Sequence, residues 1–145
     1  MKKITIILMA ALLVCGIAGA CMPGKSGGET ALDITTPSDS TVEIIYFHGK
    51  QRCATCVAIE RETKALVEEE LASQVKDGKV SFRIVDISTD QGRRLASQFK
   101  VSFSSLFLVT SEGAQDLTRF AFANARNHAQ EFRKELKAMV MESLE

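Results

Sequence analysis

Two cysteines separated by two residues are the groups in this chain best suited to do chemistry. They are Cys53 and Cys56, with Ala54 and Thr55 between them, and a basic stretch, GKQR, comes just before. A thiol pair at this spacing can exchange with a disulfide, because one thiolate attacks a disulfide sulfur and the second then displaces the partner. The same pair could instead bind a soft metal ion or lie inert in a core.

The neighbouring residues indicate which thiol would react first. If a helix begins at Cys53, the partial positive charge at its N-terminus favours the Cys53 thiolate. Arg52 is adjacent and Lys50 is close by, and both positive charges act in the same direction. We therefore expect Cys53 to be the nucleophile and Cys56, about one turn further on, to be the buried resolving thiol. Thr55 could donate a hydroxyl hydrogen bond to either sulfur.

Metal or metalloid binding is the main alternative to disulfide exchange for the same residues. His48, Cys53 and Cys56 could supply one nitrogen and two soft sulfurs to Zn²⁺, Cu⁺ or As³⁺. Three ligands on one loop are only a partial zinc set, and His48 could more simply pack over the dithiol and affect its pKa. A purely structural disulfide is a third interpretation, but closing so short a loop removes little entropy from the unfolded chain.

The segments around the dithiol predict a strand before it and a long helix after it. Residues 42–47 are apolar on both faces, which is typical of a central strand covered by helices. Helical spacing follows, and Asp77-Gly78 ends the helix. Residues 80–87 predict a second, less completely buried strand, parallel to the first. The apolar stripe of the long helix comprises Ile59, Leu66, Val67, Leu71 and Val75.

The second half of the chain predicts a helix, a hairpin and a final helix. Ser88 or Thr89 can cap the first of these helices. Residues 106–109 form an apolar strand, residues 111–113 a tight turn, and residues 117–122 alternate as the returning strand. Asn124 or Asn127 is expected to cap the final helix. The predicted order of elements is therefore β-α-β-α-β-β-α.

That order, with the C-x-x-C motif where the first strand meets the first helix, resembles the thioredoxin fold over about residues 42–144. The resemblance implies an α/β fold with a mixed four-stranded sheet flanked by helices. It also implies a thiol-disulfide oxidoreductase whose redox group is the Cys53/Cys56 dithiol itself, with no cofactor. Its partners would be protein dithiols and disulfides, or a membrane electron donor.

Two departures from the thioredoxin pattern concern the surroundings of the dithiol. Ser105 stands where thioredoxins place a cis-proline, and a cis bond before a residue other than proline costs roughly 2.5–4 kcal/mol. We therefore expect a trans or rearranged loop there. Tyr46 occupies the approximate place of the acid that thioredoxins bury beneath the dithiol.

A narrower resemblance joins YFHGKQRCATC and the later SSLFLV to a small family of bacterial envelope proteins. This family carries the label nitrophenyl compound nitroreductase subunit. Nothing in the chain suggests a flavin or nicotinamide site. The resemblance therefore implies an accessory electron carrier rather than the nitroreductase.

The N-terminus has the anatomy of a secretory signal. Two lysines precede an apolar stretch, and residues 18–21, AGAC, resemble a bacterial lipobox, in which a cysteine is lipidated after cleavage. We expect a lipoprotein-type signal over residues 1–20, a lipidated Cys21 at the start of a flexible tether (residues 21–41), and a folded domain over residues 42–145. Free secretion and a retained membrane anchor are the alternatives.

Composition limits the partners and the compartment. The 145-residue chain has 18 basic and 18 acidic residues, and this balance argues against nucleic-acid binding. Cys15 would leave with the signal and Cys21 would carry lipid, so Cys53 and Cys56 would remain as the free thiols. The expected location is the cell envelope, anchored to a membrane and facing the periplasm or the exterior, where disulfides persist.

Overall fold

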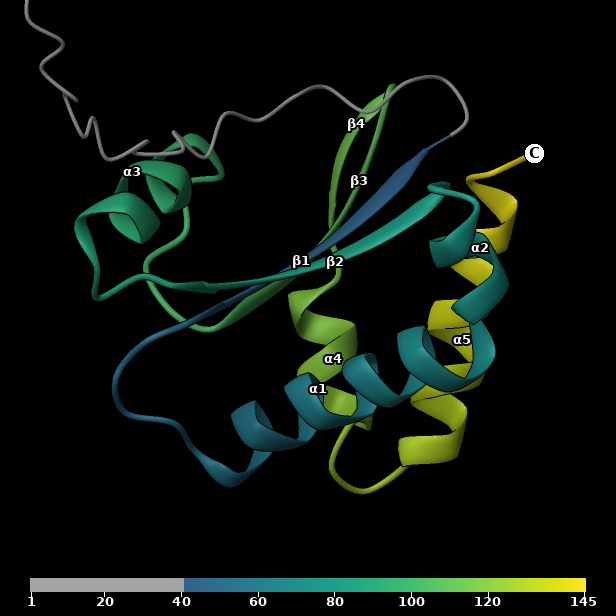
Figure 1. Ribbon diagram of the computed structural model, residues 1–145. Coiled ribbons are helices and arrows are strands. Elements are labelled where there is room, and N and C mark those ends of the chain that lie inside the picture. Colours follow the sequence, from purple (N-terminus) through teal and green to yellow (C-terminus); the bar gives the residue numbers. More distant parts are fainter. Residues whose placement is uncertain (1–40) are drawn as a thin grey trace, which may run out of the picture. The chain divides into compact units, whose positions relative to one another are not determined.

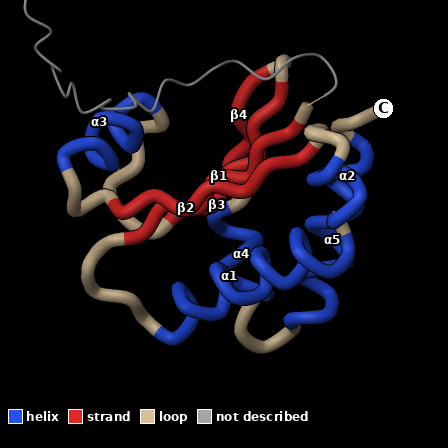
Figure 2. The backbone as a smooth tube through the Cα atoms, viewed as in Figure 1, coloured by secondary structure: helices blue, strands red, loops and turns tan. Residues whose placement is uncertain are grey.

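A four-stranded mixed sheet forms the centre of the domain (Figures 1 and 2). The computed structural model describes residues 41–145, so the predicted signal, nearly all of the tether, and Cys21 lie outside the described residues. The strand order is β2-β1-β3-β4. Strand β1 (Val42–His48) runs parallel to β2 (Val80–Asp86) and antiparallel to β3 (Ser105–Thr110), which pairs with β4 (Gly113–Asp116).

Burial explains the places of the two longest strands. Every residue of β1 except His48 is buried, as expected for a strand with neighbours on both edges and helices on both faces. Strand β2 lies at the edge of the sheet, and the Ile84 side chain there is 43% exposed. The prediction that this second strand is less completely buried than the first is confirmed.

The helices form a layer on each face of the sheet (Figure 1). Helix α3 (Asp90–Gln98) covers one face. Helices α1 (Ala54–Ala65), α4 (Thr118–Asn124) and α5 (Ala129–Glu142) cover the other. This arrangement confirms the predicted α/β fold with a mixed four-stranded sheet flanked by helices. Within residues 41–145, no helix is both long and apolar enough to cross a bilayer.

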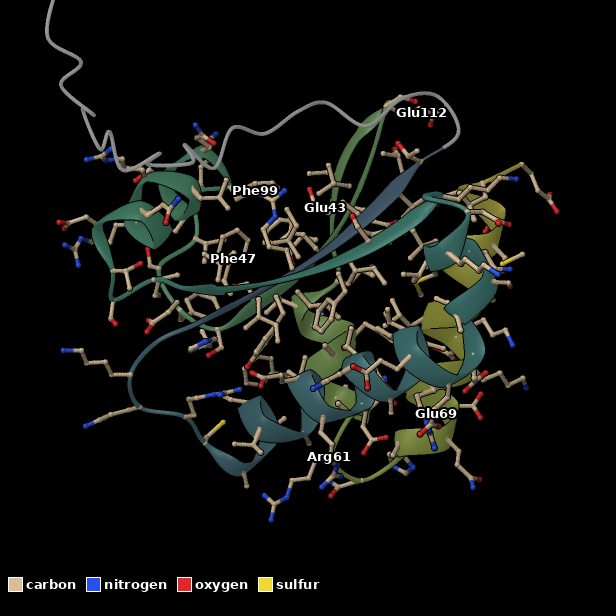
Figure 3. The ribbon with its side chains drawn as sticks, in the orientation of Figure 1. Glu43, Phe47, Arg61, Glu69, Phe99 and Glu112 are labelled. Atoms are coloured by element: carbon tan, nitrogen blue, oxygen red, sulfur yellow. The ribbon has the colours of Figure 1, made fainter. Side chains whose placement is uncertain are left out.

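Each face of the sheet has its own hydrophobic core. The larger core joins β1 and β3 to α1, α4 and α5, and the smaller one packs beneath α3. In the smaller core, the ring of Phe47 lies 5.4 Å from that of Phe99 and 5.9 Å from that of Phe107, measured between centroids (Figure 3). These two cores pack against both faces of β1, and a short loop (residues 49–52) joins the end of β1 to the dithiol.

The predicted long helix is interrupted by a π-helical segment, η1 (Leu66–Glu70), before a short helix α2 (Ala72–Lys76). The N–H of Leu71 donates to the carbonyl of Leu66 at 3.0 Å, which is the i→i+5 bond of a π-turn. The wider turn rotates the following residues relative to the buried stripe. Val75 is therefore 41% exposed, and the prediction that it faces the core is wrong.

The returning strand of the hairpin is shorter and earlier than predicted. Strand β4 ends at Asp116, and most of the predicted strand 117–122 is helix α4. Leu117, Ala121 and Ala125 are buried at helical spacing of four, which the apparent alternation of the sequence concealed. Side-chain burial against α1 and β3 decides this segment, so the predicted strand is wrong.

Of the two predicted helix caps, one is confirmed and one is wrong. Thr89 caps α3, and its hydroxyl accepts a 3.0 Å hydrogen bond from the N–H of Gly92. Helix α5 begins after His128 without a side-chain cap, so neither predicted asparagine caps it. Asn124 instead lies in α4, where its side chain donates to the carbonyl of Phe120.

Candidate functional site

The dithiol lies at the junction of β1 and α1, with one sulfur outside and one inside. Cys53 is the N-cap residue of α1 and is exposed, whereas Cys56 in the first turn is buried and only 6% exposed. The two sulfurs are 2.6 Å apart, compared with roughly 2.05 Å in a disulfide bond. The pair is therefore within reach of forming a disulfide with little movement.

Hydrogen-bond donors around the Cys53 sulfur favour its thiolate. The Cys56 side chain and then the Cys56 backbone N–H, which lies 3.2 Å from the sulfur, lower the pKa of Cys53 below its usual value. The backbone N–H groups of Thr55 and of Cys53 itself act in the same direction. The geometry is that of a helix N-terminus binding an anion, so the thiolate is stabilised by the start of α1.

Arg52 does not have the electrostatic role expected for it. Its guanidinium forms an ion pair with Glu60, one of the outward residues of α1. Neither Arg52 nor Lys50 is among the main causes of the lowered pKa of Cys53. The Arg52 Nε is buried and has no hydrogen-bond partner. Arg52 thus belongs to the site because it lines the cleft in front of the dithiol, while its charge pairs with the Glu60 carboxylate.

Two other predicted site residues, Thr55 and His48, make contacts other than the expected ones. Thr55 acts through its backbone N–H, and its hydroxyl forms no hydrogen bond with either sulfur. His48 ends β1, where its ring lies 6.1 Å from the ring of Tyr46 and its Nδ1 lies 3.1 Å from the Gly49 carbonyl. Across the part of the chain that the structure describes, no three His, Cys, Asp or Glu side chains gather as a metal site.

The loop opposite the dithiol presents Ser104 rather than Ser105. Ser105 is buried at the start of β3, and its hydroxyl donates to the carbonyl of Phe103 at 3.0 Å. All peptide bonds within residues 41–145 are trans, which confirms the expectation for this loop. Ser104 is the residue that lines the space in front of Cys56.

An open cleft of about 770 Å³ leads to the dithiol. Two large aromatic side chains on its lining are exposed, Phe103 at 64% and Phe122 at 38%. Neither side chain was predicted to belong to the site, because Phe122 was assigned to a strand and Phe103 to no element. An apolar residue between serines, as in SFSS, is the signal that could have identified Phe103. The lining comprises Gly49, Gln51, Arg52, Cys53, Cys56, Ile87, Ser102, Phe103, Ser104 and Phe122.

Tyr46 lies beneath the dithiol, in the place predicted for it. Its side chain is fully buried, and its hydroxyl donates a 2.8 Å hydrogen bond to the backbone carbonyl of Cys56. Burial raises the pKa of Tyr46 above its usual value, although the nearby Ser104 and Arg52 side chains act to lower it. The phenol therefore remains protonated and a donor at neutral pH.

These features together suit disulfide exchange. An accessible sulfur with a lowered pKa can attack a disulfide, and a second sulfur behind it can release the product. The cleft leaves room for a partner's sulfur above Cys53, and its two exposed aromatic rings offer apolar contact to that partner.

Solved structures that are similar to this chain are similar to it at low sequence identity. No protein-family model matches the chain, and no curated protein matches it. A thioredoxin from Fasciola hepatica is 15% identical, with 72% of this chain and 83% of that chain covered and a TM-score of 0.47. A thioredoxin from Thermus thermophilus is also 15% identical, with 71% and 76% covered and a TM-score of 0.42. An uncharacterised thioredoxin-like protein from Clostridium perfringens is 12% identical, with 72% and 96% covered and a TM-score of 0.40.

Proposed function

We propose that this protein is a thiol-disulfide oxidoreductase or electron carrier that uses the Cys53/Cys56 dithiol. The observation that carries the proposal is the exposed Cys53 sulfur at the start of α1, 2.6 Å from the buried Cys56 sulfur. Its substrates would be the dithiols and disulfides of other proteins, which reach Cys53 through the open cleft.

The exchange proceeds in two balanced steps. The Cys53 thiolate attacks a partner disulfide, and a mixed disulfide forms while one partner sulfur leaves and takes up a proton. Cys56 then loses its proton and attacks the Cys53 sulfur. The intramolecular disulfide forms, the second partner sulfur leaves as a thiolate and is protonated, and the two electrons have passed to the partner.

Titration of the full chain against glutathione tests this proposal. We expect one reversible two-electron couple that depends on both Cys53 and Cys56, and that Cys53→Ser removes completely. Arg52→Lys is the matched control, because it keeps the cleft and the charge and is expected to retain the couple. Absence of a couple would refute the proposal, as would stoichiometric Zn²⁺ or Cu⁺ binding that depends on His48 without disulfide turnover.

We further propose that the protein acts in the cell envelope, held at a membrane by lipid on Cys21. The support is the AGAC sequence after an apolar segment with two leading lysines. Mass spectrometry of the mature protein is expected to find acyl chains on an N-terminal Cys21. An unmodified mature N-terminus elsewhere would contradict the anchor.

At the membrane, the proposed role is that of a reductant supplied by a membrane electron donor. This role agrees with the accessory electron carrier implied by the resemblance to the envelope family. Cys56→Ser stops the exchange at the mixed disulfide, so it is expected to trap covalently on Cys53 any partner whose disulfide Cys53 attacks, namely the acceptor or the oxidised form of the donor. Recovery of a membrane protein bound through a reducible bond supports the role. If no such adduct forms in membranes in which the wild type is active, the role is contradicted.

A further inference from the structure

A buried tyrosine connects the central strand to the first turn of the dithiol helix. Tyr46 lies in the middle of the sheet, where it pairs with Leu106 of β3 and Ile84 of β2. Its hydroxyl crosses to α1 and donates to the Cys56 carbonyl at 2.8 Å. Within an α-helix, a carbonyl also accepts from the N–H four residues later. The tertiary bond from Tyr46 is therefore additional to the helix's own hydrogen bonds and fixes the turn to the sheet.

Side chains from two loops lie close to the phenol. Ser104, from the loop before β3, and Arg52, from the loop before α1, both act to lower the pKa of Tyr46. Arg52 is in turn anchored by its ion pair with Glu60, one turn beyond Cys56 on α1. The hydroxyl of Tyr46 thus bonds to the backbone of Cys56, and residues of two loops lie nearby.

The second step of the exchange is the one that depends on this contact. Cys53 is exposed and can reach a partner without help from the interior, whereas Cys56 is buried and must approach Cys53 along the line of the bond that breaks. Reactions between held groups are sensitive to displacements of about 1 Å, which can slow them by as much as about 100-fold.

We infer that Tyr46 is a positioning residue for the resolving step, which holds the Cys56 backbone so that its sulfur faces Cys53. The inference rests on the proposed function. In the step concerned, the Cys56 thiol loses its proton, the Cys53–Cys56 bond forms, and the bond between Cys53 and the partner sulfur breaks. The partner's sulfur leaves with the electron pair and takes up a proton.

A two-phase reaction separates the steps that Tyr46 does and does not affect. The reduced full chain, with Cys15 and Cys21 changed to serine, is mixed with an equimolar amount of 5,5′-dithiobis(2-nitrobenzoate). The first thionitrobenzoate is released when Cys53 attacks, and the second when Cys56 resolves the mixed disulfide. For Tyr46→Phe, we expect an unchanged first rate and a second rate lower by about tenfold or more.

Thr63→Val is the matched control, because it also removes a buried hydroxyl, in this case one on α1. Thr63 is fully buried and its hydroxyl has no partner, so both rates are expected to stay at the wild-type values. Ser104→Ala removes one neighbour of the phenol and is expected to slow the second phase by a smaller factor. It also serves as the test if Tyr46→Phe does not fold, as judged from circular dichroism.

The outcomes separate this inference from the function on which it rests. A wild-type second phase that is absent, or that persists in Cys56→Ala, would refute the proposed function itself. A normal wild-type second phase that is equally fast in the folded Tyr46→Phe and Ser104→Ala variants would overturn the role of Tyr46 alone. Equal slowing of both phases would also overturn it, because that result indicates a general structural effect.

Discussion

At the scale of single residues, the reactivity of Cys53 follows from where its backbone places it. The residue is the N-cap of α1, so N–H groups of the first turn point at its sulfur. The nearest positive side chain, Arg52, is paired with Glu60. Fixed donors therefore matter more here than a neighbouring charge, because that charge is already balanced by a carboxylate.

The lowered pKa of Cys53 gives a testable pH dependence. In the reduced protein, we expect the rate of Cys53 alkylation by iodoacetamide to rise with a midpoint below that of the unfolded chain, which is about 8.5. The sign also applies to stability. A thiol whose pKa is lower in the folded state stabilises the reduced protein above the unfolded pKa, and this contribution is lost as the pH falls through the folded pKa.

Cys56→Ala tests the cause of that lowered pKa. It removes the Cys56 side chain, the largest contribution to the lowered pKa, and keeps the backbone N–H groups. The alkylation midpoint of Cys53 is expected to move upward, to a value still below that of the unfolded chain. A midpoint that does not move would contradict the part assigned to the second sulfur.

At the scale of elements, helix α3 packs so closely on the end of β2 that only glycine fits at one position. A Cβ on Gly92 would lie 1.9 Å from the carbonyl oxygen of Asp86, and backbone atoms cannot yield as a flexible side chain can. The same helix is capped by Thr89, whose hydroxyl bonds the N–H of Gly92. The cap and the close contact together fix the start of α3 next to the end of β2. The short loop between them contains Ile87, which lines the cleft.

Gly92→Ala is therefore expected to destabilise the protein by about 1–3 kcal/mol, the usual cost of overpacking. The change is measured as the shift in free energy of unfolding in urea. Gly49→Ala is the matched control, because a Cβ there would meet no atom within 4 Å, and it is expected to change stability much less. Equal effects of the two substitutions would show that the contact with Asp86 does not determine the result.

At the scale of the whole domain, two cores on opposite faces of the sheet hold the dithiol in place. Tyr46 belongs to the larger core and Phe47, the next residue, to the smaller one. The strand that ends just before the loop leading to the dithiol is thus packed on both faces. Rigidity of this kind is what a site needs when its two sulfurs must stay close together.

Leu136→Ala measures the contribution of the larger core. Leu136 in α5 is fully buried, so we expect a loss of about 2–5 kcal/mol in the free energy of unfolding. Lys137→Ala, the next residue, removes only an exposed ion pair with Glu70 and is expected to cost about 0–1 kcal/mol. A small effect of Leu136→Ala would mean that α5 is not essential to the core.

The sequence by itself determined the strand before the dithiol, the start of the helix after it, the apolar strand and turn of the hairpin, and a helix cap at Ser88 or Thr89. Each of these depends on neighbours within a few residues, where apolar spacing, turn residues and cap chemistry act directly. It also placed Cys53 outside and Cys56 inside, because a helix start has a known geometry.

Only the tertiary structure decided the π-turn at residues 66–70, the helix at 118–124, and the surroundings of the two sulfurs. Arg52 turns to Glu60, Ser104 rather than Ser105 faces the dithiol, and Phe103 and Phe122 border the cleft from distant parts of the chain. The physical reason is that burial against other elements outweighs local preference. A side chain bonds to the residues near it, and many of these residues come near only when the chain has folded.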